Sequence, residues 1–209
     1  KSVHVTGLLR SRSARTALIA VAAFVVLGMP KAAFGVAWPS VAVDLDRDIS
    51  QLGLILSIFV AGYFAGTLSV GRLIDRMGTG PILLAAATAA TIAIVGYAAA
   101  GTWLFLILSA VVLGTAGGLL DAGVNAHVAL HRGARVMGWL HAGFGVGSAL
   151  GPAMATGFLA IDAGWRIGVW IIAGLQAAVV VALAFSLRDG DGPAGRPTPG
   201  RVRRHPVVF

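Results

Sequence analysis

The feature that most constrains this sequence is a series of long apolar stretches, separated by short segments that carry almost all the charged residues. About 20 mainly apolar residues are enough to cross the hydrocarbon core of a bilayer as a helix. The first stretch of at least that length begins after Arg15 and ends at Val43, interrupted only by Lys31. The others are Gln51–Gly71, Met77–Leu120, Val136–Ile161 and Ile167–Leu187. The pattern predicts an integral membrane protein made of transmembrane helices.

The stretch from Met77 to Leu120 is too long for one span, and Gly101-Thr102 is its natural break. We therefore expect a third helix from about Pro81 and a fourth from Trp103 to about Leu130. The prediction is an all-α bundle of six transmembrane helices over residues 16–188. It is flanked by a basic tail over 1–15 and a disordered basic tail over 189–209, rich in Gly and Pro.

The composition excludes several other classes of protein. Hydrophobic residues make up 57% of the chain and charged residues only 11%, and there is no Cys. A soluble domain has about 25% charged residues. These values argue against a disordered chain, a cytosolic enzyme and a disulfide-stabilised secreted module.

The positions of Lys and Arg predict the orientation in the membrane. With a cytoplasmic N-terminus, all of the 16 except Lys31, Arg47 and Arg166 lie on the cytoplasmic side. We therefore expect a multi-pass protein of the plasma membrane (a cell inner membrane) with both termini cytoplasmic. The net charge of +8 follows from this distribution and does not indicate nucleic-acid binding. A cleaved signal peptide within the first stretch is the alternative, but it would spread the basic turns over both sides.

A charged segment follows the second stretch. Residues 71–78 read Gly-Arg-Leu-Ile-Asp-Arg-Met-Gly, and we expect them to form a cytoplasmic turn. An Asp beside an Arg at a helix end can pair with neighbouring helices and their dipoles, and flanking glycines allow the backbone to turn. Such a group can hold one arrangement of a bundle closed. The simpler interpretation is a solvated turn with a weak ion pair.

This segment resembles the Gly-x-Leu-x-Asp-Arg-x-Gly signature of the major facilitator superfamily, at the place in the helix order where that family carries it. Thr79-Gly80-Pro81 stand where the family usually has basic residues. The resemblance implies the N-terminal six-helix half of a twelve-helix transporter. It assigns a cytoplasmic gating role to Gly71, Leu73, Asp75, Arg76 and Gly78.

The fourth helix carries a line of small and polar residues. Gly114, Gly118, Asp121 and Asn125 follow one another at spacings of four, three and four, which is one helical face. An ionisable group inside a membrane is costly unless it faces a cavity or a partner. If the next turn centres near His131, Asp121 and His141 lie at the same depth, suited to carrying a proton or binding a polar solute. A structural hydrogen bond is the alternative for each.

The two helices also resemble the fucose permease-like branch of the same superfamily, through residues 118–126 (Gly-Leu-Leu-Asp-Ala-Gly-Val-Asn-Ala) and 140–147 (Leu-His-Ala-Gly-Phe-Gly-Val-Gly). The resemblance implies that Asp121 and Asn125 line a central cavity and that Asp121 takes part in proton coupling. It places the His-Ala-x-Phe pattern of some members on His141, Ala142 and Phe144. Asp stands where the sugar symporter has Glu, so no sugar specificity is implied.

Lys31 is the remaining charge within a span. It lies sixteen residues, or about 24 Å, along the first helix from Arg15, directly after Pro30. We expect it either to face the central cavity, where it pairs with Asp121 or binds an anionic solute, or to lie near the interface if the helix begins later. Asp44, Asp46, Arg47 and Asp48 are expected to form a solvated outer loop.

Enzyme chemistry finds little support. His127 and His131 can reach one metal ion, but Glu is absent and there is no His-Glu-x-x-His. No phosphate-binding Gly-x-x-x-x-Gly-Lys loop exists either, so we expect neither an enzyme nor a cofactor.

The predicted function is secondary transport of a small polar solute by alternating access, coupled to protons. Asp121 would carry the proton, Asn125 and His141 would contact the solute or relay the proton, and Lys31 would be a charge partner. Because one bundle cannot alternate alone, a second six-helix half or a second copy is the expected partner. The alternative is a membrane assembly or regulatory subunit that does not transport.

Overall fold

The computed structural model describes residues 12–188, so the predicted tails lie outside the described part except for residues 12–15. Within that part the chain is helical and contains no strand. The elements are α2 (Arg12–Asp44), the 3-10 turn η1 (Ile49–Gln51), α3 (Leu52–Met77), α4 (Thr79–Ala98), α5 (Trp103–His131), α6 (Ala134–Ala160) and α7 (Trp165–Arg188). Long helices follow the predicted stretches, because in lipid every backbone group must find its partner within the helix.

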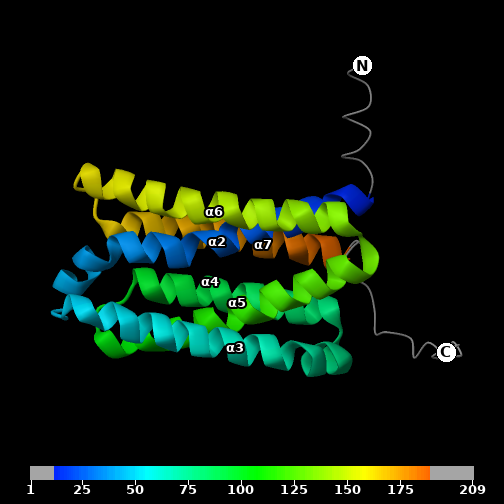
Figure 1. The fold of residues 1–209 in the computed structure, drawn as a ribbon, viewed down its shortest axis with the longest axis horizontal. Helices are drawn as coiled ribbons and strands as arrows, with labels where there is room; N and C mark the ends of the chain where they lie inside the picture. Colours follow the sequence, from blue (N-terminus) through cyan, green and yellow to red (C-terminus); the bar gives the residue numbers. More distant parts are fainter. Residues whose placement is uncertain (1–11, 189–209) are drawn as a thin grey trace, which may run out of the picture.

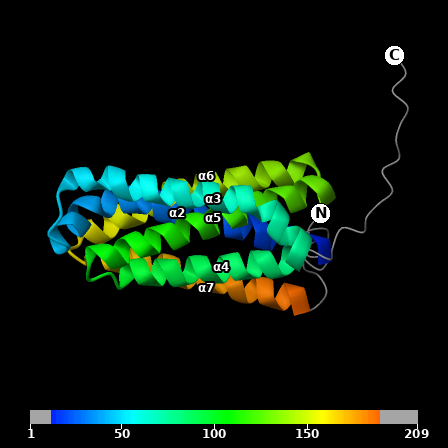
Figure 2. The same ribbon diagram turned by 90° about the horizontal axis from the view of Figure 1, so that it is seen from below.

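The helices run roughly parallel to one long axis and alternate in direction (Figure 1). In the view of Figure 2, α3 and α6 form one face, α4 and α7 form the opposite face, and α2 and α5 lie between them. The main contacts join α2 to α6, α3 to α5, α4 to α5 and α4 to α7. The bundle therefore consists of two three-helix groups, α2/α6/α7 and α3/α4/α5, which meet mainly through α4 and α7.

Glycines bring the α2/α6 pair into backbone contact. A Cβ at Gly147 or Gly151 of α6 would overlap the carbonyl oxygen of Val25 or Met29 in α2. In return, a Cβ at Gly28 of α2 would lie 2.9 Å from the Ser148 backbone nitrogen. Small residues at four-residue spacing let membrane helices approach closely, so that dispersion forces and weak Cα–H···O contacts stabilise the pair. We call this contact the α2/α6 seam.

The α3/α5 pair is built in the same way. A Cβ at Gly114 or Gly118 of α5 would overlap the carbonyl oxygen of Phe59 or Tyr63 in α3, and one at Gly66 of α3 would overlap that of Thr115. We call this contact the α3/α5 seam. Both glycines of the polar face predicted for the fourth helix, Gly114 and Gly118, thus pack against α3 rather than line an open space.

Five of the six long helices in the described part are long and apolar enough to cross a membrane: α2, α3 with the turn before it, α4, α5 and α7. The sixth, α6, has a similar length of 27 residues, but its glycines and Pro152 lower its hydropathy. It lies along α2 for most of its length (Figure 1). The all-helical, polytopic fold predicted from the sequence is confirmed.

The two ends of the bundle differ in charge. The α3–α4 and α5–α6 connections, with Arg72, Arg76, Arg132 and Arg135, lie at the end where α2 begins and α7 finishes (Figure 1). The opposite end carries Arg166 and Arg47, with Asp44 at the end of α2. The orientation of the two ends relative to the membrane stays a prediction from the sequence.

At the end opposite the basic connections, Asp44 joins two helices. It accepts hydrogen bonds from Trp165 Nε1 (2.9 Å) and from Arg166, and Arg166 Nη2 donates to the Ala100 carbonyl at 3.1 Å. The sequence predicted a solvated loop around Asp44. Instead its carboxylate ties α2 to α7, and Arg166 extends the link to the α4–α5 connection.

Candidate functional site

The carboxylate of Asp121 lies near the middle of α5 and is held by two side chains. Tyr63 of α3 donates its hydroxyl to Oδ2, and Asn125, one turn further along α5, donates Nδ2 to Oδ1 at 2.9 Å. All three side chains are half-buried. The Oδ1 atom of Asn125 is buried and accepts no hydrogen bond from the part of the chain described. The group thus holds an acid together with an unused acceptor.

A cavity of about 510 Å³ lies beside this group, between the two helix pairs. Its walls come mainly from α2, α3, α5 and α6. Residues of α4 and α7, among them Ala90 and Gln176, complete the lining. Its size falls in the range of small-molecule sites. Tyr63 borders the cavity, whereas Asp121 does not. Tyr63 therefore connects the half-buried Asp121 carboxylate to the cavity wall.

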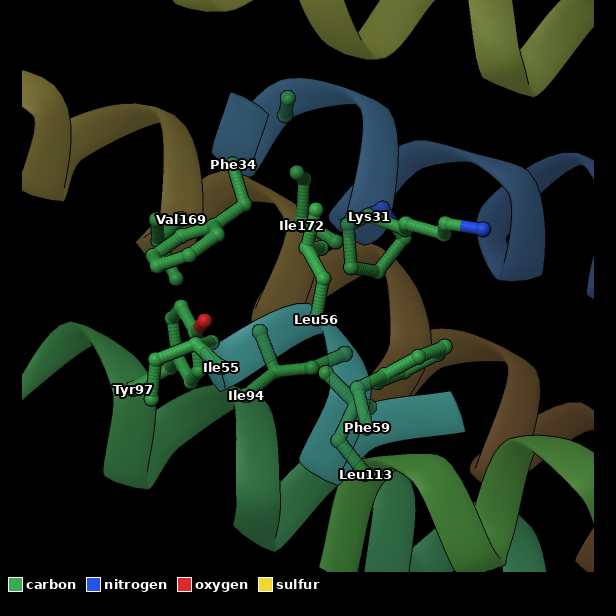
Figure 3. Close-up of a pocket in the computed structure, with 12 residues that line it drawn as sticks. Lys31, Phe34, Ile55, Leu56, Phe59, Ile94, Tyr97, Leu113, Val169 and Ile172 are labelled. Atoms are coloured by element: carbon green, nitrogen blue, oxygen red, sulfur yellow. The ribbon is translucent and has the colours of Figure 1, made fainter. Parts of the chain in front are cut away.

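Lys31 borders the same cavity from α2, together with Pro30. A narrower pocket of about 30 Å³ adjoins it, lined by aromatic and aliphatic side chains. Figure 3 shows the Lys31 side chain extending on the side where Phe59 lies, away from Phe34 and Tyr97. No hydrogen bond or ion pair joins Lys31 to another residue between 12 and 188. Lys31 is exposed, and its ammonium has no partner charge within that part of the chain.

His141 lies apart from the Asp121 group. It is exposed on α6, and its Nδ1 contacts the Met137 carbonyl oxygen at 2.9 Å. The principal neighbour of α6 is α2 and that of α5 is α3, so the two helices touch little. The structure brings Asp121 and Asn125 together and places Lys31 on the neighbouring cavity, but it joins neither Lys31 nor His141 to Asp121.

Comparison with known proteins identifies the family. The model of the Major Facilitator Superfamily matches residues 19–208, which include α2 from Ile19 onward and the other five long helices of the described region completely. The chain belongs to this superfamily. Membership places it among transporter proteins rather than enzymes, and the long apolar helices make it a multi-pass membrane protein.

Two curated proteins are similar to the chain over 64% of its length. The mouse (Mus musculus) protein named sodium-dependent glucose transporter 1A is 33% identical over 139 residues, which are 32% of its own length. The human (Homo sapiens) protein named sodium-dependent glucose transporter 1 is 29% identical over 137 residues, 26% of its length. The matched part of the chain thus spans about a third or less of the length of either relative.

The superfamily-like motif at 71–78 differs from the sequence prediction in one respect. The predicted turn is wrong, because α3 continues through Gly71 and Asp75 to Met77. The helix stops only at Gly78, which has φ +87° and donates its N–H to the Ile74 carbonyl oxygen at 2.8 Å. The charges of Arg72, Asp75 and Arg76 are tolerated in a helix that extends beyond the apolar stretch, because their side chains are exposed.

The motif residues make few contacts within the bundle. Asp75 and Arg76 are exposed and form no hydrogen bond or ion pair with other residues of the 12–188 region. Leu73 is half-buried, and a Cβ at Gly71 would meet no atom within 4 Å. The weak local ion pair considered from the sequence is not formed.

Tyr63 is the site residue that sequence analysis missed. It is one of only two Tyr in the chain and the only one in the second apolar stretch. A hydroxyl in the middle of a span needs a partner, so this isolated Tyr was a usable signal. The sequence alone does not identify Asp121 as its partner, because that contact depends on the packing of α3 against α5.

Proposed function

We propose that the chain is one half of a secondary active transporter that moves a small polar solute together with protons, and that Asp121 carries the proton. The observation that supports this most strongly is the Asp121 carboxylate within the span of α5, bonded to a Tyr63 that borders a solute-sized cavity. An isolated charge at this depth costs several kcal/mol, so it is retained for a function.

The hydrogen bonds suit both charge states of the acid. Tyr63 and Asn125 each donate to the ionised carboxylate. A protonated Asp121 becomes a donor and needs an acceptor. Rotation of the Asn125 amide would offer its unused Oδ1 in that role. Proton uptake would then exchange one hydrogen bond for another, instead of leaving a buried donor without a partner.

Transport itself would follow the alternating-access scheme of the superfamily. The cavity lies between two tightly packed helix pairs, and a second six-helix bundle, from another chain or a second copy, would cover its open side. We propose that Asn125 and His141 contact the solute or relay the proton. The segment with Gly71, Leu73, Asp75, Arg76 and Gly78 would gate a cytoplasmic end, in a plasma-membrane protein with both termini inside. The resemblance of residues 118–126 and 140–147 favours the fucose permease-like branch.

The names of the two relatives refer to sodium and glucose, so the coupling ion needs a direct test. Proteoliposomes containing the 209-residue chain and a pH-sensitive dye would be given glucose and other small polar solutes under a pH gradient or a Na⁺ gradient. We expect solute entry to move protons in the original protein. Asp121→Asn should abolish proton movement and leave solute exchange between the two sides in place.

Asp46→Asn is the matched control, because Asp46 is an exposed loop residue with φ +51°, a conformation that Asn tolerates. It should move protons like the original protein. Proton movement that survives Asp121→Asn would remove Asp121 from the mechanism. Solute uptake driven only by a Na⁺ gradient would identify Na⁺, and not the proton, as the coupling ion. Native mass spectrometry of the same vesicles would count the copies in the active assembly.

A further inference from the structure

The chemistry of the cavity wall restricts the solute. Most of its lining is apolar, and Phe59, Phe144, Leu56 and Leu113 contribute large side chains. Only four side chains bring a polar group: Lys31, Tyr63, Ser148 and Gln176. The cavity is thus an apolar space of about 510 Å³ with a small number of polar positions.

Three of those four polar groups already use a donor within the protein. The Tyr63 hydroxyl donates to Asp121, Ser148 Oγ donates to the Gly28 carbonyl at 3.5 Å, and Gln176 Nε2 donates to the Ala87 carbonyl at 3.4 Å. Each of these bonds joins two helices of the bundle, so these donors are engaged by the protein itself. Lys31 is the one lining side chain of the described region with a free charged donor.

The position of Lys31 makes this charge costly. It follows Pro30 in α2. The helix continues for thirteen residues beyond Lys31, to Asp44, which corresponds to a rise of about 20 Å. A Lys near the middle of a span is retained where it faces water, a partner or a ligand. Since no carboxylate of the bundle pairs with it, an anion entering the cavity would supply the missing partner.

We propose that the solute is an organic anion with an apolar body and one carboxylate, and that Lys31 binds the carboxylate. The proposal rests on the proposed transport function and specifies its substrate class. Phe59 and Phe144 would contact the apolar body, and the carboxylate would accept hydrogen bonds from the Lys31 ammonium. A sugar fits this wall poorly, because each buried hydroxyl without a partner costs about 1–3 kcal/mol.

Binding can be measured without transport. The full chain in phosphatidylcholine nanodiscs would be titrated calorimetrically at pH 7 with 4-phenylbutyrate, with its neutral amide and with glucose, and empty nanodiscs would correct for partition into lipid. We expect the carboxylate to bind at least about tenfold more tightly than the amide, since a charge-assisted hydrogen bond is worth about 1.5–3 kcal/mol. Glucose should bind more weakly than the carboxylate.

Lys31→Met should weaken carboxylate binding by about tenfold or more and leave amide binding unchanged, whereas Lys31→Arg should keep the preference for the carboxylate. Arg135→Met removes an exposed charge far from the cavity and should change neither. The melting temperature of each variant would show that it is folded.

The proposal would be overturned if the acid and the amide bound equally, if glucose bound more tightly than the acid, or if Lys31→Met bound the carboxylate as tightly as the original protein. Loss of carboxylate binding in nanodiscs that contain phosphatidylglycerol would also overturn it, by identifying a lipid headgroup as the anion at Lys31. None of these results touches the proton test. Conversely, unchanged proton movement in Asp121→Asn would end the coupling proposal and leave the binding result intact.

Discussion

The two seams and the space between them use the same small residue for opposite purposes. Along the seams, a Cβ on Gly118 or Gly147 would overlap a backbone oxygen of the neighbouring helix. One residue from Gly118, a Cβ on Gly117 would face the cavity with its nearest neighbours at an ordinary 3.7 Å. Two residues from Gly147, a Cβ on the exposed Gly145 would meet nothing within 4 Å. The difference teaches that each helix pair is a rigid unit, whereas the boundary between the pairs is loosely filled.

The largest effect should come from breaking the α2/α6 seam. Gly147→Leu would force the α6 backbone away from Val25, and because backbone atoms cannot rotate aside, we expect a loss of more than about 3 kcal/mol and little monodisperse protein. Size-exclusion chromatography in detergent and thermal unfolding followed by fluorescence would measure this. Gly145→Leu, two residues away and open, should behave like the original protein; equal damage in both would contradict the seam.

The neighbouring glycines of α5 give a sharper test, since they differ by one position. Gly118→Ala places a methyl group against the Tyr63 carbonyl oxygen and should cost about 1–3 kcal/mol. Gly117→Ala adds the same methyl group at the cavity wall and should be neutral or stabilising by up to about 1 kcal/mol, through higher helix propensity. Unfolding temperatures of the two variants would decide. Equal values would show that α3 and α5 are not in backbone contact.

A smaller effect is expected from the hydrogen bond that crosses the α3/α5 seam at the cavity. Tyr63→Phe removes the donor to Asp121 and should destabilise the bundle by about 1 kcal/mol, the usual range for such bonds within membranes. Tyr97→Phe is the control, because the Tyr97 hydroxyl has no hydrogen-bond partner among residues 12–188. Differential unfolding of the pair should show a loss for the first variant alone.

The smallest effect should come from the link at the end opposite the basic connections. The ion pair between Asp44 and Arg166 is about 40% exposed on both sides (39% and 41%), so solvent screens it and Asp44→Asn should cost less than about 1 kcal/mol. Added salt should shrink the difference from the original protein. Asp162→Asn, at an exposed turn residue with φ +55°, should change nothing. A loss above that limit would show that solvent does not screen this link as its exposure implies.

Helix positions could be predicted well because lipid leaves the backbone no alternative to helix, so apolar stretches and helices coincide. The end of α3 could not, since apolarity marks the hydrocarbon boundary and the helix continues six residues past Gly71 until Gly78. Charged residues on an exposed helix face look the same in a sequence as charged residues in a turn.

The pairing of helices could not be predicted from the sequence, for a different reason. Glycines four residues apart show that a helix packs closely against something, but they do not name the neighbour. The placement of Asp121 and Asn125 on one face was predictable from spacing, and their bond confirms that adjacency. The Tyr63 partner and the separation of His141 both depend on α3 lying against α5 and α6 against α2.

That pairing has a consequence for biosynthesis. Gly28 in the first helix meets Ser148 in the fifth, 120 residues later along the chain. At a translation speed of about 5–20 residues per second, the ribosome needs on the order of 10 s to deliver the second member of this contact. During that interval the first helix, with its lone ammonium and with Gly28 uncovered, resides in the translocon or the lipid without its permanent neighbour. Quality-control factors that shield unassembled helices would meet this protein at that stage.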